Sequence, residues 1–166
     1  PSIVYGLFGM LFFTKTLKMG YSMMSGACTL AIMILPLIMR TTEEALISVP
    51  DSYREGSFGL GAGKLRTVFQ VVLPSAIPGI LAGVILGIGR IVGETAALMY
   101  TSGTVAKYAG AMESGRTLAL HMYVLTSEAL HVDQASATAV VLLVIVIGIN
   151  AFSGFIAKKL AKKTGE

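Results

Sequence analysis

The feature that most restricts the fold of this chain is a set of long apolar runs. Residues 137–157 contain no charged side chain, and Asn150 is their most polar member. A membrane-spanning helix needs about 20 such residues. In hydrocarbon every backbone polar group must be satisfied internally, which helices achieve within one segment. We therefore predict an all-α, polytopic transmembrane bundle without paired strands, forming one membrane domain over residues 1–166.

Further apolar runs bring the expected number of spans to about four. Residues 22–39 and 77–100 are long enough to span, whereas residues 1–13 are too short and resemble the end of a span whose start is missing. Composition agrees, because 13% of the residues are charged against about 25% in soluble domains. The chain begins with Pro1 inside an apolar run, so we expect a bundle that is truncated at its N-terminus.

Two polar stretches, residues 40–70 and 101–136, separate these spans. Residues 40–70 and the C-terminal tail each carry four Lys or Arg, whereas the loops between the other spans carry two each. Basic loops face the cytoplasm, so residues 40–70 and the C-terminus should be cytoplasmic and residues 101–136 external. This orientation explains the net charge of +4 better than a nucleic-acid partner, which we do not expect.

The cytoplasmic stretch contains signals for short helices. The sequence T-T-E-E at 41–44 resembles a helix start, and Pro50 would end that helix. Ser52 and Glu55 have capping-box spacing, which predicts a second helix from near Tyr53. Glycines at 59, 61 and 63 would end it, and residues 64–72 would form another helix before the next span begins at Leu73 and Pro74. Such a hinged knob suits docking into another protein, although a solvated loop is the simpler alternative.

Small and charged residues should share one face of the third span. At 100° per residue one arc of about 80° holds Gly79, Gly83, Gly87, Arg90, Glu94, Ala97 and Thr101. The glycines permit close approach of another helix. Charges at this depth cost about 2.5–3.5 kcal/mol each, and Arg before Glu is the less favoured order for a structural pair. We therefore favour a functional role, with the guanidinium binding a tetrahedral oxyanion, over a structural ion pair.

Five positions of the cytoplasmic stretch resemble the E-A-A-x3-G-x9-I-x-L-P loop of ABC-importer permeases. Four match outright, Val71 replaces the isoleucine, and Gly56 and Ser57 replace the two alanines. The resemblance implies the MetI-like permease fold and a coupling helix that binds a separate ATP-hydrolysing subunit. The positions that it assigns to ATPase docking are Arg54, Glu55, Gly56, Ser57, Gly61, Ala62 and Lys64.

A closer resemblance is to the permeases of phosphate-specific importers. R-I-V-G-E-T-A at 90–96 is similar to their R-x-x-G-E-T-A signature, and P-S-I-V-Y-G-L-F at 1–8 and residues 40–45 are similar to other family segments. The A-type subunit matches best, with the C-type close. The resemblance implies a phosphate path at Arg90, Glu94 and Thr95. It also implies a second permease subunit, an extracytoplasmic phosphate-binding protein, a prokaryotic plasma membrane, and about two spans ahead of Pro1.

Other functions fit these residues less well. Permeases for molybdate, sulfate or polyamines share the coupling loop, so they remain the main alternative. An intramembrane enzyme would need a nucleophile–base pair or a metal cluster, and an inert anchor leaves the buried charges unexplained. The phosphate-loop pattern at 59–64 fails because Phe58 occupies a glycine position, so ATP hydrolysis should lie on another chain. We expect this chain to bind no metal and no cofactor. Glu128 and His131 have the spacing of metal ligands, but we expect His121 and His131 to be surface or interface residues. We expect Cys28 to serve in packing.

Overall fold

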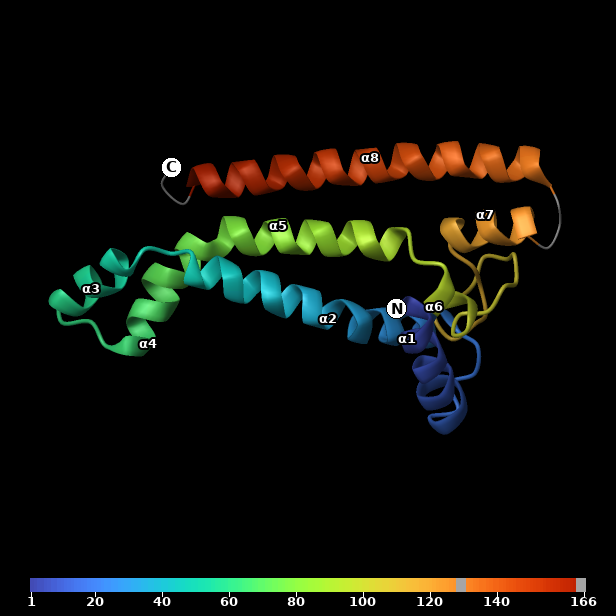
Figure 1. Ribbon diagram of the computed structural model, residues 1–166, viewed down its shortest axis with the longest axis horizontal. Coiled ribbons are helices and arrows are strands. Elements are labelled where there is room, and N and C mark those ends of the chain that lie inside the picture. Colours follow the sequence, from blue (N-terminus) through green and yellow to red (C-terminus); the bar gives the residue numbers. More distant parts are fainter. Residues whose placement is uncertain (128–130, 164–166) are drawn as a thin grey trace. The chain divides into compact units, whose positions relative to one another are not determined.

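The structure is a computed structural model that describes the backbone of residues 1–127 and 131–163, with side chains to residue 159. Within these residues all regular elements are helices, as predicted (Figure 1). In this described part of the chain, three helices are long and apolar enough to cross a membrane: Met23–Ile47, Lys64–Val92 and Val132–Lys159. The helix Ser2–Thr16 is apolar but shorter. Glu128 lies outside the described residues.

The chain divides into two compact units. Residues 1–35 and 89–148 form the first, and residues 36–88 and 149–166 form the second. Helices α2, α5 and α8 each begin in one unit and end in the other. The elements are α1 (Ser2–Gly9), the π-helix η1 (Met10–Thr16), α2 (Met23–Ile47), α3 (Asp51–Gly59), α4 (Lys64–Thr67), the π-helix η2 (Val68–Val72), α5 (Leu73–Val92), α6 (Ala96–Met99), α7 (Leu118–Ser127) and α8 (Val132–Lys163).

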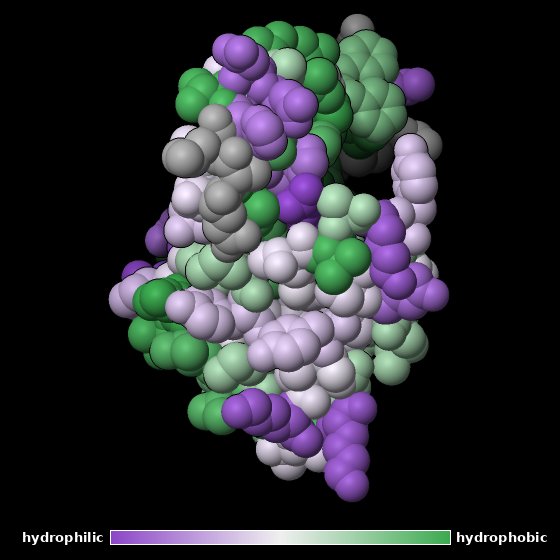
Figure 2. Space-filling model, turned by 90° about the vertical axis from the view of Figure 1, so that its right-hand side faces the viewer, coloured by the Kyte–Doolittle hydropathy of each residue, from purple (hydrophilic) through white to green (hydrophobic). Residues whose placement is uncertain are grey.

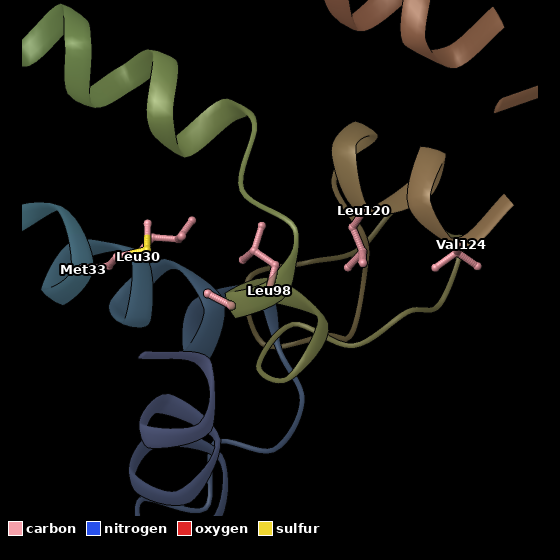
Figure 3. Close-up of a cluster of buried hydrophobic side chains, with 6 residues drawn as sticks. Leu30, Met33, Leu98, Leu120 and Val124 are labelled. Atoms are coloured by element: carbon pink, nitrogen blue, oxygen red, sulfur yellow. The ribbon is translucent and has the colours of Figure 1, made fainter. Parts of the chain in front are cut away.

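The core of the first unit joins α2, α6 and α7. Leu98 of α6 lies between Leu30 of α2 and Leu120 of α7, and Leu120 is fully buried (Figure 3). Helix α7 lies within the stretch of residues 101–136 that separates two of the predicted spans. Helix α1 packs closely on α6, because a Cβ built on Gly6 would lie 2.9 Å from the Cα of Ala97. The short helix α6 is therefore held from several sides.

The loop of residues 100–117 closes the N-terminal end of α2. The amides of Met23 and Met24 donate to the carbonyls of Glu113 (3.0 Å) and Ala111 (2.8 Å), which satisfies donors that a helix start leaves unpaired. Lys107 forms an ion pair with Glu113 at 2.8 Å, and this bond lowers the pKa of the Glu113 carboxyl. Figure 2 views this end of the first unit, where hydrophilic and hydrophobic side chains are mixed.

The second unit is built on a close approach of α2 to α5. Its core contains Ala45, Val49, Val72 and Ala76. A Cβ built on Gly79 would lie 2.7 Å from the Cβ of Ala45, and one on Gly83 would overlap the side chain of Thr41. Gly87 is buried. Small residues therefore let the two helices lie in contact along this face.

We predict that Gly83→Ala destabilises the protein, because the added methyl group displaces Thr41. Overpacking of this kind costs about 1–3 kcal/mol. Gly89→Ala on the same helix is the matched control, since a Cβ there meets nothing within 4 Å, and it should be neutral or stabilising by up to about 1 kcal/mol. Thermal unfolding of the full-length permease in detergent measures both. An equal or higher midpoint for Gly83→Ala would contradict the close approach.

Two helix boundaries in the second unit differ from the sequence prediction. Residues 41–44 do not start a helix; they continue α2 to Ile47. The Thr41 hydroxyl donates to the carbonyls of Leu37 and Ile38 within the same helix, so it is not available as a cap. The start expected at Leu73 is where α5 begins, but no break precedes it, because α4, η2 and α5 form one continuous helix from Lys64 to Val92. The π segment η2 ends just before Pro74, which has no N–H to offer the carbonyl four residues earlier.

The third span also ends earlier than predicted, at Val92 rather than near Tyr100. Residues 93–95 are not helical, and α6 follows as a separate short helix. At the other end of the chain, α8 begins at Val132, ahead of the predicted residue 137, and runs to Lys163. None of the residues in its most apolar window is buried. The surface of α8 is therefore left for lipid or for another protein.

Candidate functional site

Helices α3 and α4 form a two-helix knob at one end of the second unit (Figure 1). Helix α3 starts at Asp51, with Pro50 as its N-cap and no side-chain capping bond. The predicted capping box of Ser52 and Glu55 is therefore wrong. The fixed φ of Pro50 (−55°) and the bond from the Tyr53 amide to the Pro50 carbonyl (3.1 Å) start the helix instead. None of the residues of α3 is buried, so the knob is exposed.

The turn between α3 and α4 depends on Gly61. Its φ is +81°, a left-handed conformation that glycine adopts without strain. The Gly61 amide donates to the carbonyl of Phe58 (2.9 Å), and the Ala62 amide donates to that of Ser57 (3.1 Å). Gly63, with φ −74° and ψ 161°, then caps α4. The predicted glycine hinge thus rests on one position with positive φ.

One face of α3 turns inward. The Arg54 guanidinium donates to the carbonyls of Leu46 and Val49 and to the Asp51 carboxylate, each at 2.8 Å. Three residues on, the Ser57 hydroxyl bonds that of Thr67 at 2.8 Å, and Thr67 is 1% exposed. Both side chains lie on the same face of the helix. The polar groups of Arg54 and Ser57 therefore bond to other residues of this same chain.

The opposite surface of the knob is open. Glu55 and Gly56 are exposed, and so are Leu60 and Leu65, at 92% and 77%. Lys64 is exposed at the start of α4. A hollow between the turn and α4 is lined by Ser57, Leu60, Gly61, Ala62 and Arg66. The knob thus presents apolar side chains together with the Glu55 carboxylate and the Lys64 ammonium group around the turn.

The second candidate site lies where α5 unwinds. Arg90 occupies the last turn of α5 and is exposed, whereas Glu94 lies beyond the helix end and is 8% exposed. Helical periodicity predicts one face for both residues, and this prediction is wrong because the helix ends at Val92. Among residues 1–127 and 131–159, whose side chains are described, no ion pair joins Arg90 to Glu94. The structural ion pair that was the alternative to a functional role is therefore absent there.

Glu94 instead organises the start of α6. Its Oε1 accepts a hydrogen bond from the amide of Ala97 at 3.1 Å, and a carboxylate at a helix start is favourably placed. Thr95 is the N-cap residue of α6, and its hydroxyl lies 3.5 Å from the carbonyl of Gly93. The R-x-x-G-E-T-A segment therefore contains the break between α5 and α6. Arg90 is exposed there, whereas Glu94 is held by its bond to Ala97.

Several buried hydroxyl side chains of the first unit were not predicted from the sequence. They share side-chain exposures of 1% or less: Ser22, Ser25, Thr29, Thr101 and Ser102. The hydroxyls of Thr101 and Ser102 donate to the carbonyls of Ala97 and Leu98 at 2.8 and 2.9 Å. In the sequence, these buried hydroxyls could have been indicated by the serine and threonine residues beside a predicted loop. Their bonds satisfy the carbonyls at the end of α6.

Membrane-length helices together with an exposed two-helix knob are typical of an integral membrane protein. The chain belongs to the family of binding-protein-dependent transport system inner membrane components, whose model matches residues 1–166. This family confirms the permease fold expected from the sequence. It also makes the chain a multi-pass membrane protein.

Curated relatives narrow the comparison. The chain is 47% identical over 103 residues to a probable ABC transporter permease protein, YqgI, of Bacillus subtilis, covering 62% of this chain and 35% of the relative. It is 33% identical over 165 residues to a PstA homolog, a phosphate transport system permease protein of Mycoplasma pneumoniae, covering 94% and 25%. It is 34% identical over 157 residues to the PstA of Mycobacterium leprae, covering 92% and 51%. The chain thus spans about a quarter to a half of these relatives. No solved structure matches it.

Proposed function

We propose that this chain is part of a permease subunit of an ATP-driven importer of inorganic phosphate. The observation that carries the proposal is the R-x-x-G-E-T-A segment at the break after α5, which leaves Arg90 exposed on a membrane-length helix. A guanidinium there offers a planar fork of donors to a tetrahedral oxyanion. The relatives named as phosphate transport permeases support this choice of substrate.

In this proposal the knob is the cytoplasmic docking element for a separate ATP-hydrolysing subunit, which places the C-terminus in the cytoplasm. The exposed Leu60 and Leu65 are the anchors with the largest apolar exposure on it. The other partners are an extracytoplasmic phosphate-binding protein and a second permease subunit, for which α8 offers an unburied apolar surface. The proposal needs no cofactor, metal or nucleic acid on this chain, and it gives the chain no enzymatic activity of its own.

Substrate identity is tested with the full-length permease, its ATPase and its binding protein in proteoliposomes. We expect uptake of labelled phosphate that requires ATP and persists in an excess of sulfate or molybdate, because the related permeases are named for phosphate transport. Transport of sulfate, molybdate or a polyamine in place of phosphate would reject the substrate assignment. Absence of any ATP-dependent transport would reject the permease proposal itself.

A further inference from the structure

Helix α3 is fixed at two points to two different membrane-length helices. Near its start, Arg54 reaches back to α2, and near its end Ser57 bonds Thr67 on the helix that continues into α5. All of these residues belong to the second unit. We propose that Arg54 and Ser57 are positioning residues that clamp α3 to α2 and to α5, rather than contacts for the ATPase. This inference rests on the proposed function.

The Arg54 clamp uses the chemistry of a helix end. Helix α2 ends at Ile47, and its last four carbonyls have no donors within the helix. The guanidinium supplies one of the missing bonds, because one of its nitrogens donates to the Leu46 carbonyl at 2.8 Å. Its other nitrogen donates to the carbonyl of Val49, which lies in the turn after α2, also at 2.8 Å. The Asp51 carboxylate holds the same nitrogen that bonds Val49. With its donors engaged in this way, Arg54 orients α3 against α2.

The Ser57 clamp uses a buried hydroxyl. Thr67 is 1% exposed, so its hydroxyl has to find a partner inside the protein. Ser57 provides that partner at 2.8 Å. This accounts for a serine at a position where the related loop motif has alanine, because alanine could not make the bond. The two clamps lie three residues apart on one face of α3, which leaves Glu55 on the exposed side.

Two clamps have a mechanical consequence. A helix tied to one neighbour can pivot about that contact, whereas a helix tied to two moves only with both. When the ATPase moves α3, both α2 and α5 then move with it. Loosening either clamp should leave the docking surface intact while disconnecting it from the spans.

The test uses the complete complex of full-length permease, ATPase and binding protein. Two quantities are measured: the affinity of the ATPase for the permease, and the phosphate transported per ATP hydrolysed. Arg54→Met keeps the apolar stem and removes the fork, and Ser57→Ala and Thr67→Val remove the hydroxyls. Ser57→Ala raises helix propensity, so a deficit in it is not a failure to fold. Glu55→Gln is the control on the exposed face.

We expect Arg54→Met to keep the affinity of the ATPase within about twofold. It should lower the phosphate transported per ATP about tenfold, because loss of the charge-assisted bonds favours the state in which α3 is detached from α2. Arg54→Lys should recover part of this, since an ammonium can still reach one carbonyl. Ser57→Ala and Thr67→Val should each lower the ratio, and the double variant should be no worse than either. Glu55→Gln should weaken affinity at an unchanged ratio.

Other outcomes distinguish a failure of the clamp proposal from a failure of the proposed function. Loss of ATPase affinity in Arg54→Met or Ser57→Ala, with or without a change in the ratio, would make these residues docking contacts and overturn the clamp. An unchanged affinity and ratio would overturn it as well, as would additive effects of Ser57→Ala and Thr67→Val. Failure of the unaltered permease to bind the ATPase would instead reject the proposed function.

Discussion

Arg90→Gln should abolish phosphate uptake while the complex still assembles. The Arg90 side chain is exposed in the last turn of α5, so its replacement removes no packing contact. A bidentate fork supplies two charge-assisted bonds of about 1.5–3 kcal/mol each, and their loss corresponds to a decrease in uptake of about a hundredfold or more. The measurement is initial uptake of labelled phosphate in proteoliposomes, with subunit stoichiometry determined in parallel.

Three companion variants sharpen this test. Arg90→Lys should restore part of the uptake, because an ammonium carries the charge without the planar fork. Glu94→Gln should have a smaller effect, since its amide oxygen can still accept the bond from Ala97. Glu94→Ala should do more harm because α6 then loses that bond. Near-normal transport by an assembled Arg90→Gln complex would show that the arginine is not a phosphate contact.

Gly61→Val should prevent stable binding of the ATPase although the spans still insert. Gly61 has φ +81°, where a β-branched residue is strongly disfavoured and strain amounts to about 1–3 kcal/mol. Relief of that strain moves α4 relative to α3 and deforms the turn around the exposed Leu60. We expect at least about a tenfold loss of affinity, measured by co-purification and titration of the ATPase.

Gly63→Val is the matched control for this prediction. Gly63 also has open space around its Cα, but its φ is −74° and its ψ 161°, which a β-branched residue adopts readily. The same side chain two residues away should therefore leave ATPase binding nearly unchanged. Normal co-purification of the Gly61→Val permease would contradict the docking role of the turn.

The sequence predicts the elements of this fold better than their ends. Length and hydrophobicity identify α2, α5 and α8, because membrane-length helices need only a count of apolar residues. Boundaries depend on contacts that such a count does not contain. Thr41 resembles a capping residue, yet its hydroxyl bonds within α2. The end of α5 at Val92 depends on Glu94 turning to α6, a bond that helical periodicity does not predict.

The candidate sites divide in a similar way. The turn glycine at Gly61 was predictable, because few residues accept a positive φ. The inward direction of Arg54 was not, because it depends on carbonyls that become available only when α2 ends at Ile47. Ser57 gave a weak signal as a polar residue where the related motif has alanine. Its partner Thr67 is distant by ten positions and lies on a different helix.

The π segment η2 changes the rotational phase of the helix that leaves the knob. Buried positions along it are Thr67, Val72, Ala76, Gly83 and Gly87. In an α-helix, residues spaced like Ala76 and Val72 share a face, but Thr67 and Val72 are spaced too widely and would diverge. A π turn stacks residues at that wider spacing. The extra residue thus brings the hydroxyl that holds α3 and the apolar row facing α2 onto one side, so one continuous helix, Lys64–Val92, carries both.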